Sequence, residues 1–301
     1  MTAQALTERT PLIAHCVGDD VVGDDATPVP WWSVTKSAIA ACVLLLVAER
    51  KLDLDRKMKG RAFTLRQVLQ HTSGLACYTE HLDYDAANTS TRDPWTHEAL
   101  LRQSEEIAPK FPPGQGWSYS NTGYFLVRRL IEETTGSDIG SALNAMVLQP
   151  LGVERIFVAR TRDDLKRSHW GDEDGFHPGW VGHGLLMGPP AAAACMMHGL
   201  FTGRLLPPPL LAEMRERYPV QAKLEDRPWQ TAGYGLGLMM DIASPHGLCI
   251  GHSGQGPDSV AAAYHFPDLD PPLTVAAFAP GDDQGIAEQA VLDEAARLSK
   301  R

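Results

Sequence analysis

Residues 29–48 read VPWWSVTKSAIAACVLLLVA. Ser33 and Lys36 stand three positions apart at the start of the apolar run, so a helix places the hydroxyl and the amine on one face. A serine hydroxyl is a weak nucleophile until a neighbouring base takes its proton, and a lysine can serve as that base only when it is uncharged. The tetrad therefore predicts a nucleophile, Ser33, beside its base, Lys36.

The ordinary alternative is a serine N-cap followed by a solvated lysine. Two apolar segments weigh against it, since Val29–Trp32 precedes the tetrad and Ala38–Ala48 follows it without a polar interruption. A helix that is apolar all round is buried, so its first turn is expected to point into a cleft. Burial also serves catalysis, because bringing the pKa of a lysine from about 10.4 to near 7 requires roughly 4–5 kcal/mol.

The composition describes a soluble globular protein with small-molecule partners. The chain has 301 residues, is 44% hydrophobic and carries a formal charge of −10, which argues against a nucleic-acid partner. Its longest apolar run, Ala38–Ala48, is far shorter than the roughly 20 residues that span a bilayer, so no membrane partner is expected. Met1–Thr10 lacks the apolar core of a secretory signal, which predicts a cytoplasmic location.

The cysteines argue against a disulfide framework and against a structural zinc site. They are odd in number, scattered and without C-x-x-C spacing, as a reducing compartment allows. The five cysteines are Cys16, Cys42, Cys77, Cys195 and Cys249. No cofactor is expected.

The order of elements predicts an α+β fold. Two short extended segments, 11–17 and 21–22, precede the tetrad helix, and short β-compatible runs separated by Pro, Gly and Asp return near the end of the chain. Helices are expected at 64–70, 96–104, 122–135, 138–147, 191–200, 209–217 and 286–298, a loop at 161–190, and late strands at 235–242, 248–252, 259–266 and 273–278. This order suggests an antiparallel sheet flanked by helices, with a mainly helical lobe inserted into it.

Two further constellations carry candidate chemistry. Tyr119 and Asn121 follow the Pro/Gly-rich loop 111–116 and begin a helix, so they are either a packed aromatic and an N-cap, or a proton relay and a substrate-binding amide. Residues 251–256 read GHSGQG at the end of a predicted strand. Glycines there let another backbone approach closely, and a strand edge can offer N–H donors to an oxyanion.

The three constellations in this order resemble the serine β-lactamase and penicillin-binding protein family, especially its class C-like and esterase branch. The resemblance runs from about Trp31 to Phe278. It is carried by WSVTKS (32–37), TLRQVLQHTSGL (64–75), FPPG (111–114) with YSNTGY (119–124), and YGLG (234–237) before HSG (252–254).

The resemblance implies a role for each candidate residue. Ser33 is the expected acylated nucleophile, Lys36 its base, Tyr119 the proton relay and Asn121 a ligand of the acyl-side amide. The expected oxyanion donors are the backbone amides of Ser33 and Gln255, and the substrate-binding edge comprises His252, Ser253, Gly254 and Gln255.

The resemblance also implies a β-lactamase/DD-peptidase-like architecture in a single catalytic domain, 1–301. We expect a sheet lobe formed by 1–50 and 225–301 and a mainly helical lobe formed by 51–224. The site is expected between these two lobes.

One departure from the family pattern bears on the substrate. Enzymes dedicated to β-lactams usually place a lysine where this chain has His252, and a histidine with an ordinary pKa near 6.5 is mostly neutral at pH 7. We therefore expect a serine hydrolase acting on a small ester or amide. The alternatives are a D-amino-acid peptidase, a β-lactamase of the same family, and a non-catalytic member that binds a ligand or partner.

The loop 161–190 holds a second set of polar side chains. Their spacing matches no standard zinc pattern, so no metal site is predicted from them. They are His169, Asp172, Asp174, His177 and His183. The oligomeric state is not predicted.

Overall fold

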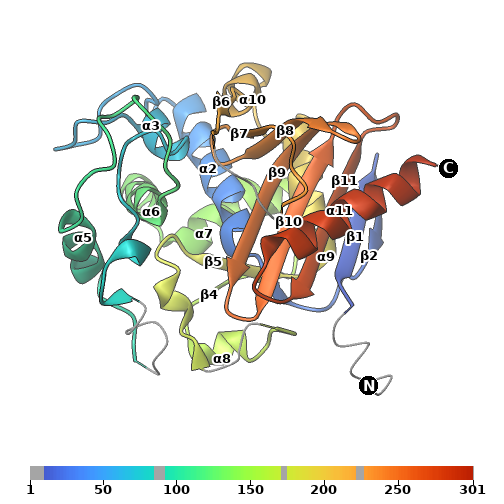
Figure 1. Cartoon of the computed structure of the whole chain (residues 1–301), viewed down its shortest axis with the longest axis horizontal. Helices are drawn as coiled ribbons and strands as arrows, with labels where there is room; N and C mark the ends of the chain where they lie inside the picture. The colour runs from blue at the N-terminus through green and yellow to red at the C-terminus, as the bar shows by residue number, and fades with distance from the viewer. Residues whose placement is uncertain (1–9, 85–91, 171–174, 222–226, 301) are drawn as a thin grey trace.

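One antiparallel sheet between layers of helices organises the computed structural model (Figure 1), which describes residues 10–84, 92–170, 175–221 and 227–300. Its strand order is β2-β1-β11-β10-β9-β8-β7-β6, so the first two strands of the chain join the last one. The strands are β1 (Leu12–Val17), β2 (Asp20–Gly23), β6 (Tyr218–Pro219), β7 (Ala232–Tyr234), β8 (Met239–Ser244), β9 (Gly247–Gly256), β10 (Ser259–Phe266) and β11 (Leu273–Pro280).

The centre of the sheet is buried on both faces. Helix α9 (Pro190–Phe201) packs against one face and α11 (Gln284–Ser299) against the other (Figure 1). Successive residues of β10 therefore enter different cores: Ala261 contributes to the large core, whereas Ala262 packs on the α11 side. Strands buried on both faces read as continuous apolar runs, as β10 and β11 do.

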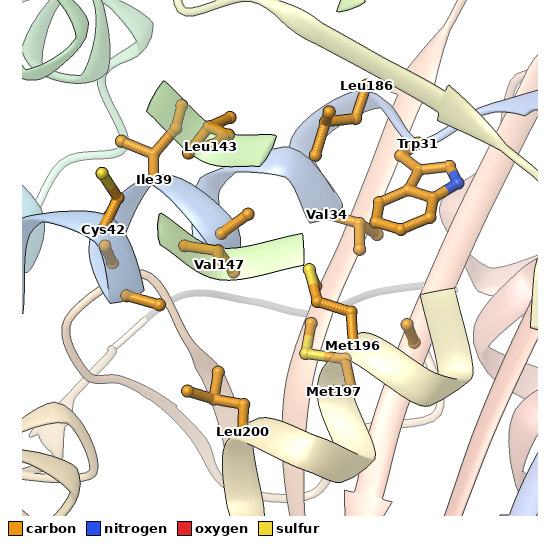
Figure 2. Close-up of a cluster of buried hydrophobic side chains, with 14 of the residues drawn as sticks. Trp31, Val34, Ile39, Cys42, Leu143, Val147, Leu186, Met196, Met197 and Leu200 are labelled. Atoms are coloured by element: carbon orange, nitrogen blue, oxygen red, sulfur yellow. The ribbon is translucent and has the colours of Figure 1, made fainter. Parts of the chain in front are cut away.

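Helix α2 (Thr35–Ala48) runs through the middle of the molecule, which explains why its sequence is apolar all round. Figure 2 shows Ile39 and Cys42 of this helix near Leu143 and Val147, with Met196 of α9 in the same cluster. The large core thus surrounds the helix that carries Lys36.

A second, three-stranded sheet lies beside α2. Its order is β3-β5-β4, with β3 (Val29–Pro30), β4 (Phe157–Ala159) and β5 (Leu185–Gly188). The remaining helical segments are α3 (Leu65–Leu69), α5 (His97–Glu105), α6 (Asn121–Thr135), α7 (Ile139–Leu143), α8 (Arg162–Leu165) and α10 (Pro208–Met214), with short turns η1 (Trp32–Val34), η2 (Tyr78–Glu80), η3 (Asn144–Leu148), η4 (Gln149–Leu151) and η6 (Pro178–Trp180).

The strand predicted at 235–242 is wrong at its start. The chain makes a turn between β7 and β8, in which the N–H of Gly235 donates to the carbonyl of Leu238 at 2.8 Å. Gly237 has a φ of +71°, and a Cβ added to it would lie 2.6 Å from the Cβ of Ala40. The turn is therefore pressed against α2, a tertiary contact that the local apolar pattern does not reveal.

The loop predicted at 161–190 is also partly wrong. It contains α8, η6 and β5, and the side chains of β5 are all buried. Strand β5 is the middle strand of the small sheet, so neighbours that lie far away in the chain supply its hydrogen bonds. Strand β9 also differs from the prediction, since it continues beyond His252 to Gly256.

The predicted α+β class, an antiparallel sheet flanked by helices, is confirmed. Among the residues that the structure describes, no helix combines the length and the apolar character needed to cross a bilayer.

Candidate active site

Ser33 lies in the tight turn η1 immediately before α2. Trp32, the residue before it, has a φ of +44°, an uncommon conformation for a bulky residue. The Trp32 ring is held by its Nε1–H, which donates to Ser259 Oγ at 2.9 Å. This anchored turn leaves the half-buried Ser33 side chain at the wall of a cleft.

Lys36, in the first turn of α2, is completely buried. Its Nζ lies 2.9 Å from Ser33 Oγ and 2.8 Å from Asn121 Oδ1. Burial lowers the pKa of Lys36 well below its ordinary value, since a charged amine loses its hydration there. A neutral amine at hydrogen-bond distance from a hydroxyl is the arrangement that general-base activation requires.

Asn121 reaches Lys36 because α6 begins at this residue. Ser120 is the N-cap, and its hydroxyl accepts the N–H of Gly123 at 3.3 Å and donates to the carbonyl of Ala76 at 3.1 Å. The cap therefore falls on Ser120, which leaves the Asn121 side chain available to Lys36.

The Tyr119 ring packs beside the same amine, with Lys36 Nζ 4.9 Å from the ring centroid. Burial raises the pKa of the Tyr119 phenol well above its ordinary value, and the nearby Ser33 hydroxyl offsets part of that rise. Within the described part of the chain, the phenolic oxygen is buried and has no hydrogen-bond partner of good geometry. A neutral phenol near the nucleophile is thus left free for another partner.

Strand β9 borders Ser33 on its other side. A Cβ added at Gly254 would lie 2.5 Å from the backbone nitrogen of Ser33, and one at Gly256 would strike the Trp32 ring. Only glycine allows this approach. Gln255 stands between the two glycines and lines the cleft.

His252 and Ser253, the remaining candidate residues of the third motif, differ in whether they reach the cleft. His252 is completely buried, with Nε2 2.9 Å from the Tyr234 hydroxyl and Nδ1 2.5 Å from the Ser253 carbonyl oxygen. Burial, together with Lys36, lowers the pKa of His252 to about 3. The imidazole is therefore neutral at pH 7, and it does not line the cleft. Ser253 does line the cleft.

The cleft has a volume of 690 Å³ and an aromatic wall. The side chains of Ser33, Tyr119 and Asn121 lie along it. Besides Tyr119, the aromatic residues that line the cleft are Trp32, Tyr78, Tyr84, Trp117, Phe176 and Trp180.

Sequence reasoning missed an ion pair at the wall of this cleft. Arg227 lines the cleft and binds Glu288 of α11, with its Nε 2.5 Å from Oε2, and Glu288 is completely buried. Arg227 Nη2 also donates to Ser253 Oγ at 3.1 Å, and the Ser253 hydroxyl donates to Glu288. Arg227 stands in no recognisable motif, so no local signal pointed to it.

His183 is the second residue that the motifs missed, and it appeared only among the polar side chains of the loop at 161–190. It lines the cleft with Nε2 3.4 Å from Lys36 Nζ. Asp172 and Asp174 lie outside the described residues. In the described ranges, no group of three His, Cys, Asp or Glu side chains is placed to hold a metal ion.

The sequence profile of the family described as Beta-lactamase matches residues 23–296. The chain belongs to the β-lactamase family. Among its relatives, penicillin-binding protein 4* of Bacillus subtilis is 28% identical over 139 residues, covering 43% of this chain and 30% of that protein. Esterase EstB of Burkholderia gladioli is 34% identical over 142 residues, covering 40% and 36%. The matches thus span about a third of the length of these two relatives.

Solved structures extend the likeness of this β-lactamase-family chain over nearly its whole length. A D-stereospecific amidohydrolase from Streptomyces sp. is 26% identical with a TM-score of 0.75, covering 90% of this chain and 89% of that one. D-amino acid amidase from Ochrobactrum anthropi SV3, complexed with L-phenylalanine amide, has a TM-score of 0.81 at 21% identity, covering 99% and 96%. The predicted β-lactamase/DD-peptidase-like fold is confirmed.

Proposed function

We propose that the protein is a serine hydrolase that forms an acyl-enzyme through Ser33 and acts on a small ester or amide. The observation that carries the proposal is the buried Lys36 amine, whose Nζ lies 2.9 Å from Ser33 Oγ at the wall of an open cleft. A lysine with a lowered pKa in that position is an effective base.

In the acylation step, Ser33 Oγ bonds to the substrate carbonyl carbon while its proton passes to Lys36 Nζ. The negative charge on the carbonyl oxygen is stabilised by the backbone N–H groups of Ser33 and Gln255. The closeness of Gly254 to the Ser33 nitrogen supports this placement, because it brings the β9 backbone beside the nucleophile.

The bond to the leaving group then breaks, and the leaving oxygen or nitrogen takes a proton through Tyr119. The raised pKa keeps this phenol neutral, so it can donate its proton and recover one from Lys36. Water then attacks the acyl carbon, Ser33 regains its proton, and the acid is released.

The charges around the cleft favour esters and amides over β-lactams. His252 is neutral, and the positive charge of Arg227 is matched by Glu288. A substrate carboxylate would therefore meet no unpaired cation at either position. The aromatic lining instead suits a substrate with an apolar or aromatic side chain.

A second candidate is the hydrolysis of D-amino-acid amides or short D-peptides. It is favoured by the likeness to the Streptomyces D-stereospecific amidohydrolase, which covers 90% of this chain at 26% identity. It uses the same acyl-enzyme chemistry and differs only in the acyl group.

A fluorophosphonate probe tests the proposal. We expect a single label on Ser33, lost in Ser33→Ala and retained in Ser73→Ala, a control variant at a buried serine that does not line the cleft. A folded wild-type protein that stays unlabelled would make it a binding protein instead. Comparing kcat/KM for p-nitrophenyl esters, D- and L-phenylalanine amide and a chromogenic cephalosporin then ranks the substrates, and a clear preference for the cephalosporin would overturn the ester or amide assignment.

A further inference from the structure

His183 lies between the active-site cleft and the Lys36 amine. It follows η6 and precedes β5, and it stands between Gly182, where an added Cβ would lie 3.1 Å from Leu100 Cδ1, and Gly184, whose φ is +97°. The side chain is 2% exposed, and Nε2 lies 3.4 Å from Lys36 Nζ. This distance is at the long end for a hydrogen bond, as is common in active sites before a substrate binds.

Three polar atoms surround Lys36 Nζ: Ser33 Oγ, Asn121 Oδ1 and His183 Nε2. A neutral amine has two N–H groups and one lone pair. The oxygen of Asn121 can only accept, so it takes one N–H. If His183 Nε2 accepts the other, the lone pair is left facing the Ser33 hydroxyl, as proton abstraction requires.

The His183 ring is buried beside the Lys36 amine. Burial, with Lys36 second, lowers the pKa of His183 well below its ordinary value, so the ring is neutral and carries one N–H. The backbone carbonyl of Trp32 offsets part of this shift. A neutral ring accepts at Nε2 when its proton is on Nδ1. Nδ1 is buried, and among the described residues it has no hydrogen-bond partner of good geometry.

We propose that His183 is a positioning residue which, as the Nδ1–H tautomer, accepts a hydrogen bond from Lys36 at Nε2 and thereby directs the amine lone pair at Ser33 Oγ. The inference rests on the proposed hydrolase function. The same tautomer serves after proton transfer as well, because the ammonium then donates to Asn121, to His183 and to the Ser33 oxygen, which is now bonded to the substrate carbon.

Two substitutions separate this role from simple packing. His183→Gln keeps an acceptor oxygen near the position of Nε2, whereas His183→Leu removes it. We expect His183→Leu to lower the rate of Ser33 labelling and the kcat for an ester by roughly 10–100-fold with KM little changed, because a misdirected reacting group costs about that much. His183→Gln should recover most of the rate. His177→Gln, on the same segment but away from the cleft, should label at the wild-type rate.

A measurement on the unmodified protein covers the case in which a variant fails to fold. The ¹⁵N shifts of the His183 ring report its tautomer directly, and the proposal requires a protonated Nδ1 and an unprotonated Nε2. A protonated Nε2 would overturn it, as would a folded His183→Leu with the wild-type labelling rate or a folded His183→Gln as slow as His183→Leu. Failure of the wild-type protein to label at Ser33 would instead refute the hydrolase function, and the ring tautomer would still be read independently.

Discussion

The backbone nitrogen of Ser33 and Gly254 of strand β9 are in such close contact that a Cβ added to the glycine would lie 2.5 Å from that nitrogen. The contact brings Ser33 beside Gln255, the residue after Gly254, and these two residues, more than 200 positions apart in the chain, both line the cleft. The proposed oxyanion site depends on this contact, because both of its N–H donors must point to one oxygen atom.

Gly254→Ala should displace Ser33 and the β9 edge from each other. We expect kcat/KM for an ester to fall by about 10²–10³, the usual cost of losing one oxyanion donor. The protein should remain folded, with overpacking costing roughly 1–3 kcal/mol. Gly152→Ala is the control: a Cβ there meets open space but its φ is +67°, so stability should fall and activity should stay. A fully active Gly254→Ala would contradict the assignment of the oxyanion site.

The pH dependence of acylation should report Lys36. Its pKa is lowered by burial, so the neutral base is present at pH values where an ordinary lysine is charged. We expect the rate of Ser33 labelling to rise with pH through this lowered pKa and then reach a plateau well below pH 10. Stopped-flow labelling from pH 4 to pH 10 measures the profile, and a rate still rising near pH 10 would show that Lys36 has an ordinary pKa.

Lys36→Met should abolish acylation and stabilise the fold. Between the lowered pKa of the folded state and the ordinary value near 10.4, the unfolded chain binds more protons, so the stability of the wild-type protein rises with pH across this window. The methionine variant lacks this slope. Its advantage in the free energy of unfolding, about 1–3 kcal/mol, should be largest at low pH and shrink towards pH 10. Urea unfolding at several pH values tests this, and a variant less stable than wild type at pH 6 would contradict it.

Tyr119→Phe should separate leaving groups by their need for a proton. Loss of the phenol should lower kcat for an amide by about 10²–10³, and much less for a p-nitrophenyl ester, whose leaving group departs as an anion. Because the hydroxyl has no hydrogen-bond partner of good geometry among the described residues, the free energy of unfolding should change by less than about 1 kcal/mol. Equal losses on both substrates would argue against a relay role.

The Arg227–Glu288 pair should hold α11 to the cleft wall. Arg227→Met leaves the completely buried Glu288 carboxylate without its partner, so we expect a loss of roughly 3 kcal/mol in the free energy of unfolding. The double variant Arg227→Met/Glu288→Gln should recover much of this loss, because no unpaired charge then remains. Chemical unfolding of the two single variants and the double variant gives the coupling energy, and strictly additive losses would show that the pair does not act as a unit.

Much of the fold and of the candidate site could be predicted because both leave local signals. The apolar character of α2 on all sides predicted its burial. The candidate site residues stand at helix starts or at the end of a loop, positions that motifs in the sequence indicate: Ser33, Lys36, Tyr119 and Asn121. Their roles remain predictions until they are measured.

The parts that escaped prediction depend on distant neighbours. Strand β5 looks like a loop segment until β3 and β4 pair with it, and the turn at Gly237 exists because α2 lies beneath it. Likewise, the position of His183 matters because its ring lies beside Lys36, and that of Arg227 because it forms an ion pair with Glu288. These contacts join residues far apart in the chain, so no local pattern in a single sequence predicts them.

The pairing of β1 with β11 has a consequence for biosynthesis. In a nascent chain leaving the ribosome, Ser33 emerges more than 200 residues before β9, the strand that borders it, and before β11, which pairs with β1. Contacts of such long sequence separation form slowly and only when both ends are available. Hydrolytic competence should therefore arise only after β9, β10 and β11 have been synthesised, and fragments that end before β9 should carry the serine without its reactivity.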